Sequence, residues 1–419
     1  MPPAAHKTKT LGSNRLPTWP QTLALCGIAT LFLSASPPQS PADSSPVTNA
    51  DTSKDFPPPH WLRSSGAPPG SHYLGNAVCA GCHVDIAQTQ PNTPMGKASV
   101  SAAGSQFLTQ HPVLTYNDGA YVLRIERKGD QDFYSATDGQ QTISVPLLWA
   151  FGLGNMGQTY VFQKDDVYYE SRISFYKEID GLDLTLGHRQ RSPATLLDAL
   201  GRPLSKQEMA KCFPCHTSEA VINGELQTSQ AQAGVTCENC HGPGGQHLEA
   251  VQNRQWRNLH IFNPARLSPD DLNDFCGTCH RSTRDVLEAN VRGVKNVRFQ
   301  PYRLENSLCY DPGDKRISCL ACHNPHENLV TDLVSYDVKC LACHANRGEK
   351  PTATRAAPSC PQAVKDCVGC HMPKLDLPGA HYKFTDHYIR VYHANDAYPD
   401  SPRSKKSRER RVKKKNPRT

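Results

Sequence analysis

The chain has 419 residues and a formal net charge of +7, and only 37% of its residues are hydrophobic, with 34 prolines and 28 glycines. A soluble chain of this length normally buries a larger apolar core, so the composition argues against an ordinary globule stabilised by side chains alone. Residues 403–419 hold ten Lys or Arg and one Glu, and the rest of the chain is slightly acidic. The positive charge therefore belongs to a C-terminal tail and does not indicate a basic body.

Residues 1–36 predict an export signal, with a basic start, a short apolar run at Leu23–Leu33 and small residues at the expected cleavage point. The apolar run is shorter than the ~20 residues that cross a bilayer. We therefore expect a bacterial protein exported to the periplasm or beyond, with no nucleic acid as partner. An uncleaved N-terminal anchor stays open, because Pro37 is an awkward residue just after a cut. Residues 37–70 are rich in Pro, Ser and Ala and predict a flexible linker.

The sequence Cys-x-x-Cys-His occurs seven times. The cysteine pairs are Cys79 and Cys82, Cys212 and Cys215, Cys237 and Cys240, Cys276 and Cys279, Cys319 and Cys322, Cys340 and Cys343, and Cys367 and Cys370. The histidines that follow them are His83, His216, His241, His280, His323, His344 and His371. In c-type haem attachment, the two thiols form thioethers with the porphyrin and the histidine binds the iron. The sequence therefore predicts seven covalently attached haem c groups, with iron as the metal.

Zinc is the competing interpretation, because zinc ribbons also use Cys-x-x-Cys pairs. A zinc ribbon does not require His directly after the second Cys, and seven such histidines by accident are negligible. From Cys212 to His371, 160 residues carry six motifs, which leaves no room for a conventional domain between them. We expect short helices and loops that wrap closely spaced haems, such as a helix at Pro269–Phe275 with Ser268 as its N-cap.

Strand patterns lie between the first two motifs. Tyr121–Glu126 and Val167–Tyr176 alternate apolar and polar residues, and we expect a small antiparallel sheet over Leu114–Tyr176. Gly152–Gly157 matches a dinucleotide fingerprint, but a strand-like segment follows where that motif needs a helix, so we reject nucleotide binding. The expected division is a first haem-binding segment (71–111), a β-rich insertion (112–190), a six-haem domain (191–395) and a disordered basic tail (396–419).

Each motif histidine leaves one axial position on its iron, and eleven histidines lie outside the motifs. His247 and His326 closely follow a motif, and His387 follows the last one, which makes these three the strongest candidates for distal ligands. The weaker candidates are His111, His188 and His381, together with Met95, whose thioether would raise the potential of the first haem. The alternative for each of them is a surface or supporting role.

Several stretches resemble the multihaem cytochrome c superfamily that includes the tetrahaem electron acceptor of hydroxylamine oxidoreductase. They are Cys237–His247, Cys319–His326, Cys367–Lys374 and Phe384–His387. Tyr168–Tyr176 through to His188 is similar to exported multihaem proteins that often continue into tetratricopeptide repeats. The resemblance implies that His247, His326 and His387 are distal ligands, and it suggests His111 and His188 as further ones.

The resemblance and the motif density together predict a mainly α and irregular multihaem cytochrome c fold with few regular elements, plus a small antiparallel β insertion. The sequence departs from the family pattern in two ways. It carries no tetratricopeptide repeats, and it has no Cys-x-x-Cys-Lys, which marks the lysine-ligated catalytic haem of pentahaem nitrite reductases.

The leading interpretation is an exported electron carrier, whose haems pass single electrons between redox partner proteins. The enzyme alternative is a multihaem oxidoreductase in which one open haem acts on a small nitrogen or sulfur compound. A third alternative is a docking subunit that binds a larger respiratory complex. Membrane association through an uncleaved N-terminus or the basic tail stays open, as does a disulfide between Cys309 and Cys360.

Overall fold

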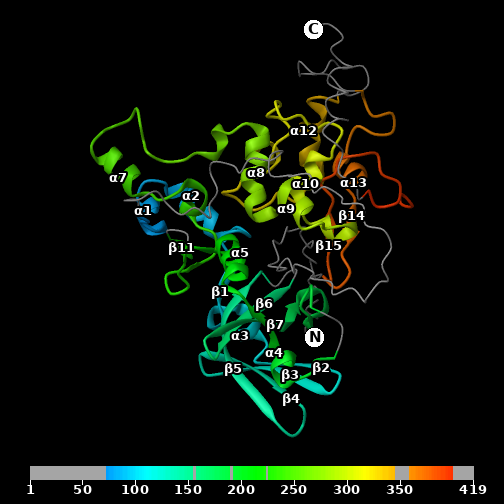
Figure 1. Cartoon of the computed structure of the whole chain (residues 1–419). Helices are drawn as coiled ribbons and strands as arrows, with labels where there is room; N and C mark the ends of the chain where they lie inside the picture. Colours follow the sequence, from blue (N-terminus) through cyan, green and yellow to red (C-terminus); the bar gives the residue numbers. More distant parts are fainter. Residues whose placement is uncertain (1–71, 154–156, 189–191, 223–224, 345–357, 400–419) are drawn as a thin grey trace, which may run out of the picture.

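The computed structural model describes residues 72–153, 157–188, 192–222, 225–344 and 358–399 (Figure 1). The predicted export signal and linker, and residues 400–419 of the predicted tail, lie outside the described residues. The strands of the main sheet gather at one end of the molecule, and most of the haem-motif helices lie at the other end (Figure 1). Over the described ranges, none of the helices has the length and apolar character that a membrane crossing requires.

A nine-stranded antiparallel sheet forms the first part of the structure. Its strands are β1 (Ser99–Ser101), β2 (Val113–Asp118), β3 (Tyr121–Lys128), β4 (Gln131–Thr137), β5 (Thr142–Phe151), β6 (Gln158–Lys164), β7 (Val167–Tyr176), β8 (Gly181–Leu184) and β9 (Gly201–Leu204). Strands β2 to β8 pair in sequence order, β1 pairs with β5, and β9 pairs with β7. Tyr116 on β2 donates a hydrogen bond to Asp183 on β8 (Oη–Oδ1 3.1 Å), so the two ends of the row meet in a nearly closed barrel.

The prediction of a mainly α fold with a small β insertion is wrong. About 34% of the structure is helix and 23% is strand, and the sheet is a barrel of more than seven strands. The strands predicted at Tyr121–Glu126 and Val167–Tyr176 are confirmed as part of β3 and all of β7. The size of the sheet was missed because β1 and β9 are too short to show alternation, and Pro203 breaks the strand pattern in β9.

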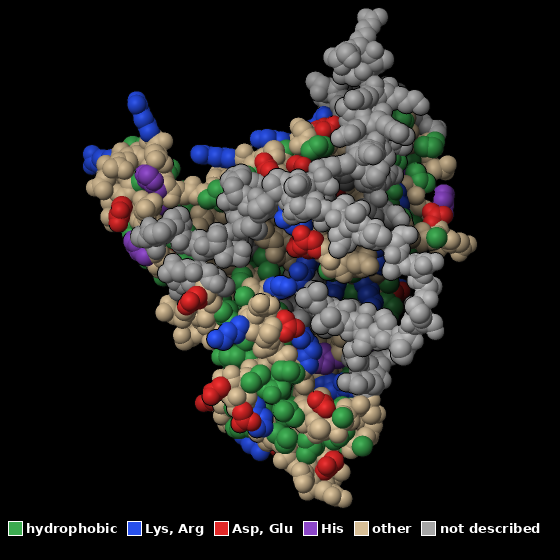
Figure 2. All heavy atoms as spheres, in the orientation of Figure 1, with side chains coloured by type: hydrophobic (Ala, Val, Ile, Leu, Met, Phe, Trp, Pro, Cys, Tyr) green, Lys and Arg blue, Asp and Glu red, His purple; other side chains and the backbone are tan. Residues whose placement is uncertain are grey.

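The barrel has its own apolar core. Alternation on β4 buries Tyr134 and Ala136, and alternation on β3 buries Leu123. The ring of Phe162 contacts Tyr134 edge-on, with 5.8 Å between the ring centroids. On the face seen in Figure 2, further hydrophobic side chains gather over this end of the molecule. Side chains therefore fill the core of the barrel.

Each haem motif begins within a short helix. The motif helices are α1 (Asn76–Ala80), α5 (Lys206–His216), α6 (Cys237–His241), α8 (Pro269–His280), α11 (Cys319–Cys322), α12 (Asp337–Leu341) and α13 (Cys367–His371). The other α-helices are α2 (Val84–Thr89), α3 (Gln106–Gln110), α4 (Leu196–Leu200), α7 (Gly245–Gln252), α9 (Thr283–Glu288) and α10 (Gln300–Glu305). α5, α6, α8 and α13 contain both cysteines and the histidine of their motif, whereas α1, α11 and α12 end before the motif does. Residues three and four apart share one face of a helix, so the four complete motif helices present two thiols and an imidazole on one side.

Capping residues fix the starts of the two longest motif helices, α5 and α8. Ser268 caps α8 by accepting a hydrogen bond from Asp271 (Oγ–N 3.2 Å), which confirms the predicted N-cap. Ser205 and Glu208 form a reciprocal capping box at the start of α5. Both helices end at the histidine of their motif, so the caps help to fix where each motif sits.

Contacts between the barrel and the haem-motif part come from both ends of the described chain. Ser99 on β1 donates to the backbone carbonyl of His216 (2.7 Å) and accepts from the backbone of Gly234 (3.0 Å). His381, which follows the last motif, contacts Asp183 on β8 (Nε2–Oδ2 2.6 Å). Its ring lies edge-on to Tyr176, with the ring centroids 4.8 Å apart. The barrel is thus tied to the second, third and seventh motifs.

Candidate haem centres

Three pairs of imidazole rings face each other, and each pair joins a motif histidine to one of the three strongest predicted distal ligands. The pairs are His83 with His247, His241 with His326, and His323 with His387. Their ring centroids lie 6.4, 6.0 and 6.2 Å apart, in that order. The structure therefore brings these predicted residues together across long stretches of sequence.

The spacing of the pairs fits an iron atom between the rings. An imidazole nitrogen binds a transition metal at ~2 Å, so two rings on opposite sides of one iron have centres roughly 6 Å apart. All three pairs have this separation, and in the described part of the chain no hydrogen bond joins the two rings of a pair. The residues present thus fit bis-histidine ligation at the first, third and fifth motifs.

Backbone carbonyls orient six of the motif and predicted distal histidines, three of which belong to the ring pairs. The Nδ1 atoms of His216, His241, His247, His344, His371 and His387 lie 2.7–3.1 Å from the carbonyl oxygens of Ala98, Phe262, Leu259, Pro358, Arg390 and Thr385, respectively. A carbonyl oxygen only accepts, so Nδ1 carries the proton and Nε2 is left with its lone pair. This tautomer is the one that presents Nε2 to a metal.

Burial disfavours the charged form of three of the paired rings, those of His323, His326 and His387. Burial lowers the pKa of His323 to about 4, and repulsion from the nearby His387 and His280 acts in the same direction. Burial also lowers the pKa of His326 and of His387. The neutral imidazole is the form that binds a metal, so the electrostatics agree with the ring geometry.

The distal rings come from later parts of the chain in a regular order. His247 follows the third motif and faces the first, and His326 follows the fifth motif and faces the third. His387 follows the seventh motif and faces the fifth. Each odd-numbered motif except the last is therefore faced by a ring from the segment after the next odd-numbered motif, and we call these motifs interlocked. The thiols of Cys79 in the first motif and Cys237 in the third are also hydrogen-bonding neighbours.

The second and fourth motifs contact each other, and the sixth lies beside the fifth and seventh. Cys215 of the second motif is 3.6 Å from the carbonyl oxygen of Thr278 in the fourth, measured from Sγ. Cys340 of the sixth motif hydrogen-bonds Cys367 of the seventh and lies near Cys322 of the fifth. The disulfide considered for Cys309 and Cys360 remains a prediction.

Apolar side chains around several motifs are exposed. Val84 and Ile86, just after the first motif, are 51% and 39% exposed, and Val338, beside the sixth, is 65% exposed. Val364, near the seventh, is also exposed.

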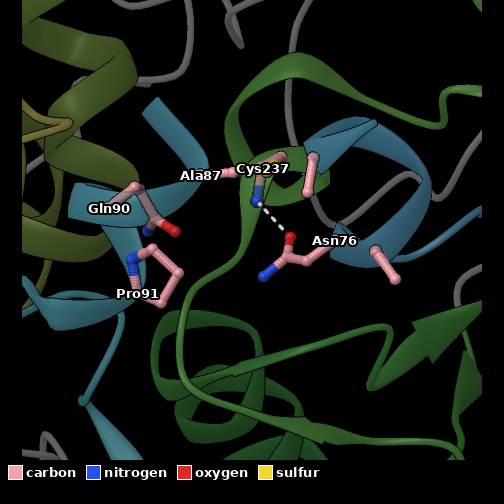
Figure 3. Close-up of a pocket in the computed structure, with 7 residues that line it drawn as sticks. Asn76, Ala87, Gln90, Pro91 and Cys237 are labelled. Carbon is pink, nitrogen blue, oxygen red and sulfur yellow. Dashed lines mark hydrogen bonds between the residues drawn. The ribbon is translucent and has the colours of Figure 1, made fainter. Parts of the chain in front are cut away.

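A cavity of about 150 Å³ lies where the first and third motifs meet, between α1, α2 and the start of α6 (Figure 3). Its lining is mostly alanine and proline, and Asn76 accepts a hydrogen bond from the backbone of Cys237 at its edge (Oδ1–N 3.3 Å). Gln90 also lines it, and its buried Oε1 has no hydrogen-bond partner. The cavity is therefore a mostly apolar hollow between the first and third motifs.

The weaker ligand candidates have other contacts in the structure. His111, His188 and His381 place Nε2 against the carboxylates of Asp180, Glu170 and Asp183, at 3.1, 3.1 and 2.6 Å. These carboxylates all belong to the barrel part, so the geometry favours a supporting role. The ring that faces His83 belongs to His247. Met95 remains a prediction.

The remaining motif histidines have different surroundings. His280 lies close enough to His323 and His387 to affect their pKa, which places the fourth motif beside the fifth. His344 and His371 are oriented by backbone carbonyls. For these two, no ring contact with a second histidine occurs among the described residues, so their sixth ligands are not identified by ring pairing.

Glu238, inside the third motif, is a supporting residue that the sequence analysis missed. Its Oε1 accepts from the backbone N–H groups of Leu74 and Gly244 (3.0 and 2.7 Å), and its Oε2 accepts from Gly75 (2.9 Å). One buried carboxylate thus ties the start of the first motif to the third. Its position between two motif cysteines was the only signal in the sequence, and that signal says nothing about its partners.

A family model described as cytochrome c554 and c-prime matches residues 188–242. The multiheme cytochrome MtrA of Shewanella baltica (strain OS185) is 28% identical over 182 residues, which cover 33% of this chain and 54% of that protein. The chain therefore spans about half the length of the curated relative that it matches. No solved structure matches.

Proposed function

We propose that this chain, a multihaem cytochrome c, is an exported electron carrier that holds seven covalently attached haem c groups. Haem iron supplies the chemistry, because it exchanges one electron between its ferric and ferrous states. The observation that carries the proposal is the set of three histidine pairs, whose ring centroids lie 6.0–6.4 Å apart on either side of a place for iron. Two imidazole ligands favour electron transfer over substrate binding, because both axial positions are taken.

In this proposal, the fourteen motif cysteines attach the porphyrins and the seven motif histidines bind iron from one side. His247, His326 and His387 bind from the other side at the first, third and fifth motifs. Backbone carbonyls fix the tautomer of His241, His247 and His387. Burial shields the rings of His323 and His387 from water. His111, His188, His381 and Met95 are not assigned as ligands.

The electron donor and acceptor are redox partner proteins, which we describe only by this chemistry. We also propose export to the periplasm, on the predicted signal at residues 1–36 and because haem c is attached outside the bacterial cytoplasm. Membrane association would depend on that N-terminus or on the basic tail. The division into a first haem-binding segment, a β-rich insertion and a six-haem domain remains a prediction.

The test combines haem stoichiometry with electron paramagnetic resonance. The intact mass of the purified protein should correspond to seven covalent haems, and the oxidised protein should give mostly low-spin ferric signals. Protein that is folded and exported but carries no covalent haem would refute the proposal. A count below seven would refute attachment at specific motifs, which peptide mapping would identify.

A second candidate is an oxidoreductase with an open haem, and the observation that favours it is the lack of a described ring partner for His344 and His371. An open iron at the sixth or seventh motif would give a high-spin signal that changes when nitrite or hydroxylamine is added. Low-spin signals alone, unaffected by either compound, would reject this candidate.

A further inference from the structure

A buried ionic cluster joins the fifth and seventh motifs. It consists of Arg303, Asp386 and Arg390, and we call it the Asp386 cluster. Arg303 is 1% exposed and Asp386 is fully buried. Arg303 donates two parallel hydrogen bonds to the carboxylate of Asp386, Nε–Oδ1 and Nη2–Oδ2, each 2.8 Å long. Arg390 adds a third, Nη1–Oδ2, of 2.7 Å. A buried bidentate ion pair of this kind is strong and rigid, and removing one of its partners destabilises the folded protein.

The cluster holds the ligand segment of the fifth motif. Asp386 directly precedes His387, whose ring faces His323. Its carboxylate also accepts from the backbone of Tyr388 (Oδ1–N 3.0 Å), so it closes the turn around His387. Nearby, Ser307 donates to the carbonyl of His387 (3.2 Å). The orientation of this ring therefore depends on Asp386 staying in place.

The same cluster supports the iron ligand of the seventh motif. The carbonyl oxygen of Arg390 lies 2.9 Å from Nδ1 of His371, and its backbone N–H donates to the carbonyl of His371 (3.2 Å). Arg390 thus touches Asp386 through its side chain and His371 through its backbone. One short segment reaches from the distal side of the fifth haem site to the proximal side of the seventh.

The cluster also carries charge. Two guanidinium groups against one carboxylate leave one net positive charge, and the surrounding aromatic rings keep it away from water. Tyr388 and Tyr398 lie under the guanidinium of Arg303, at 5.2 and 4.6 Å from Cζ to the ring centroids. A fixed positive charge in a low-dielectric site opposes the more positive ferric iron, so it favours the reduced state.

We propose that the Asp386 cluster positions the ligands of both the fifth and seventh haems and raises their two reduction potentials together. The proposal rests on the proposed haem sites at these motifs. It makes Arg303 a positioning residue with an electrostatic effect, although it touches no ligand ring directly.

Arg303→Gln and Asp386→Asn test the proposal, because they change the charge of the cluster in opposite directions. Spectroelectrochemical titration should show two midpoint potentials falling in Arg303→Gln and two rising in Asp386→Asn, with the others unchanged. Arg390→Gln should lower the same two midpoint potentials. It takes the place of Arg303→Gln if the Arg303→Gln protein does not accumulate. Arg124→Gln, on the exposed surface of β3, removes the same charge far from the cluster and should leave all potentials unchanged.

Two results would overturn the proposal. Movement of the potentials in the same direction in Arg303→Gln and Asp386→Asn would indicate general loosening of the site and no electrostatic effect. A change confined to a single haem would remove the link between the two motifs. Wild-type protein without covalent haem would instead refute the proposed function, and haem counting before each titration separates the two failures.

Discussion

Replacing His247 gives the sharpest test of the paired-ring geometry. His247 is held by the carbonyl of Leu259 (Nδ1–O 2.8 Å) with its ring centroid 6.4 Å from that of His83. In His247→Ala, the iron at the first motif should lose its sixth ligand but stay attached through Cys79 and Cys82. One haem in the proposed seven should then become high-spin, which is about one-seventh of the ferric iron.

Low-temperature electron paramagnetic resonance with spin quantification measures this fraction. His247→Met should restore a low-spin centre and raise its potential, because a thioether ligand favours the reduced iron. His260→Ala, an exposed histidine in the loop that supplies the carbonyl for His247, is the matched control and should resemble wild type. If His247→Ala keeps the full low-spin intensity with an unchanged haem count, His247 is not the distal ligand and the argument from ring spacing fails.

Glu238→Ala should lower the free energy of unfolding by about 3 kcal/mol or more, because three backbone N–H groups lose a charged acceptor. Glu238→Gln should lower it by less, and equal denaturation midpoints for the two variants would contradict this reasoning. Gly234→Ala should also lower the melting temperature, since φ is +77° and an added Cβ would clash with the carbonyl of Gly96, whereas Gly129→Ala, with a similar φ and open space, should cost less. Burial, followed by repulsion from neighbouring acids, raises the pKa of Asp274 to about 7. The folded state therefore binds this proton more tightly, so its contribution to stability is full below about pH 4 and is lost as the pH rises through 7. Denaturation of Asp274→Asn at several pH values should show a weaker loss over that window, and an unchanged pH profile would reject the assignment.

The sequence was informative where the signal is local. The motif spacing predicts which residues share a helix face, and Ser268 predicts the start of α8. His247, His326 and His387 could be proposed as distal ligands from their positions after motifs. Which iron each one faces could not be predicted, because every pair joins segments that are distant in sequence.

Long-range contacts also explain what the sequence analysis missed. The barrel closes through Tyr116 and Asp183, on strands at opposite ends of the row, and neither residue differs from an ordinary surface residue in the sequence. Arg303 lies in a segment with no motif, and only the folded chain brings it to Asp386. There, burial alone would raise the pKa of Asp386, but the hydrogen bonds and charge of Arg303 hold it below its usual value.

The interlocked order of the odd-numbered motifs has a consequence for how the protein is made. A chain emerges from the ribosome N-terminus first, so the first motif is available long before His247, and the fifth before His387. During maturation, each of these irons would remain open on one side until a later segment arrives. A chain interrupted before residue 387 would therefore leave the fifth haem exposed to adventitious ligands, even with all seven attachment motifs complete.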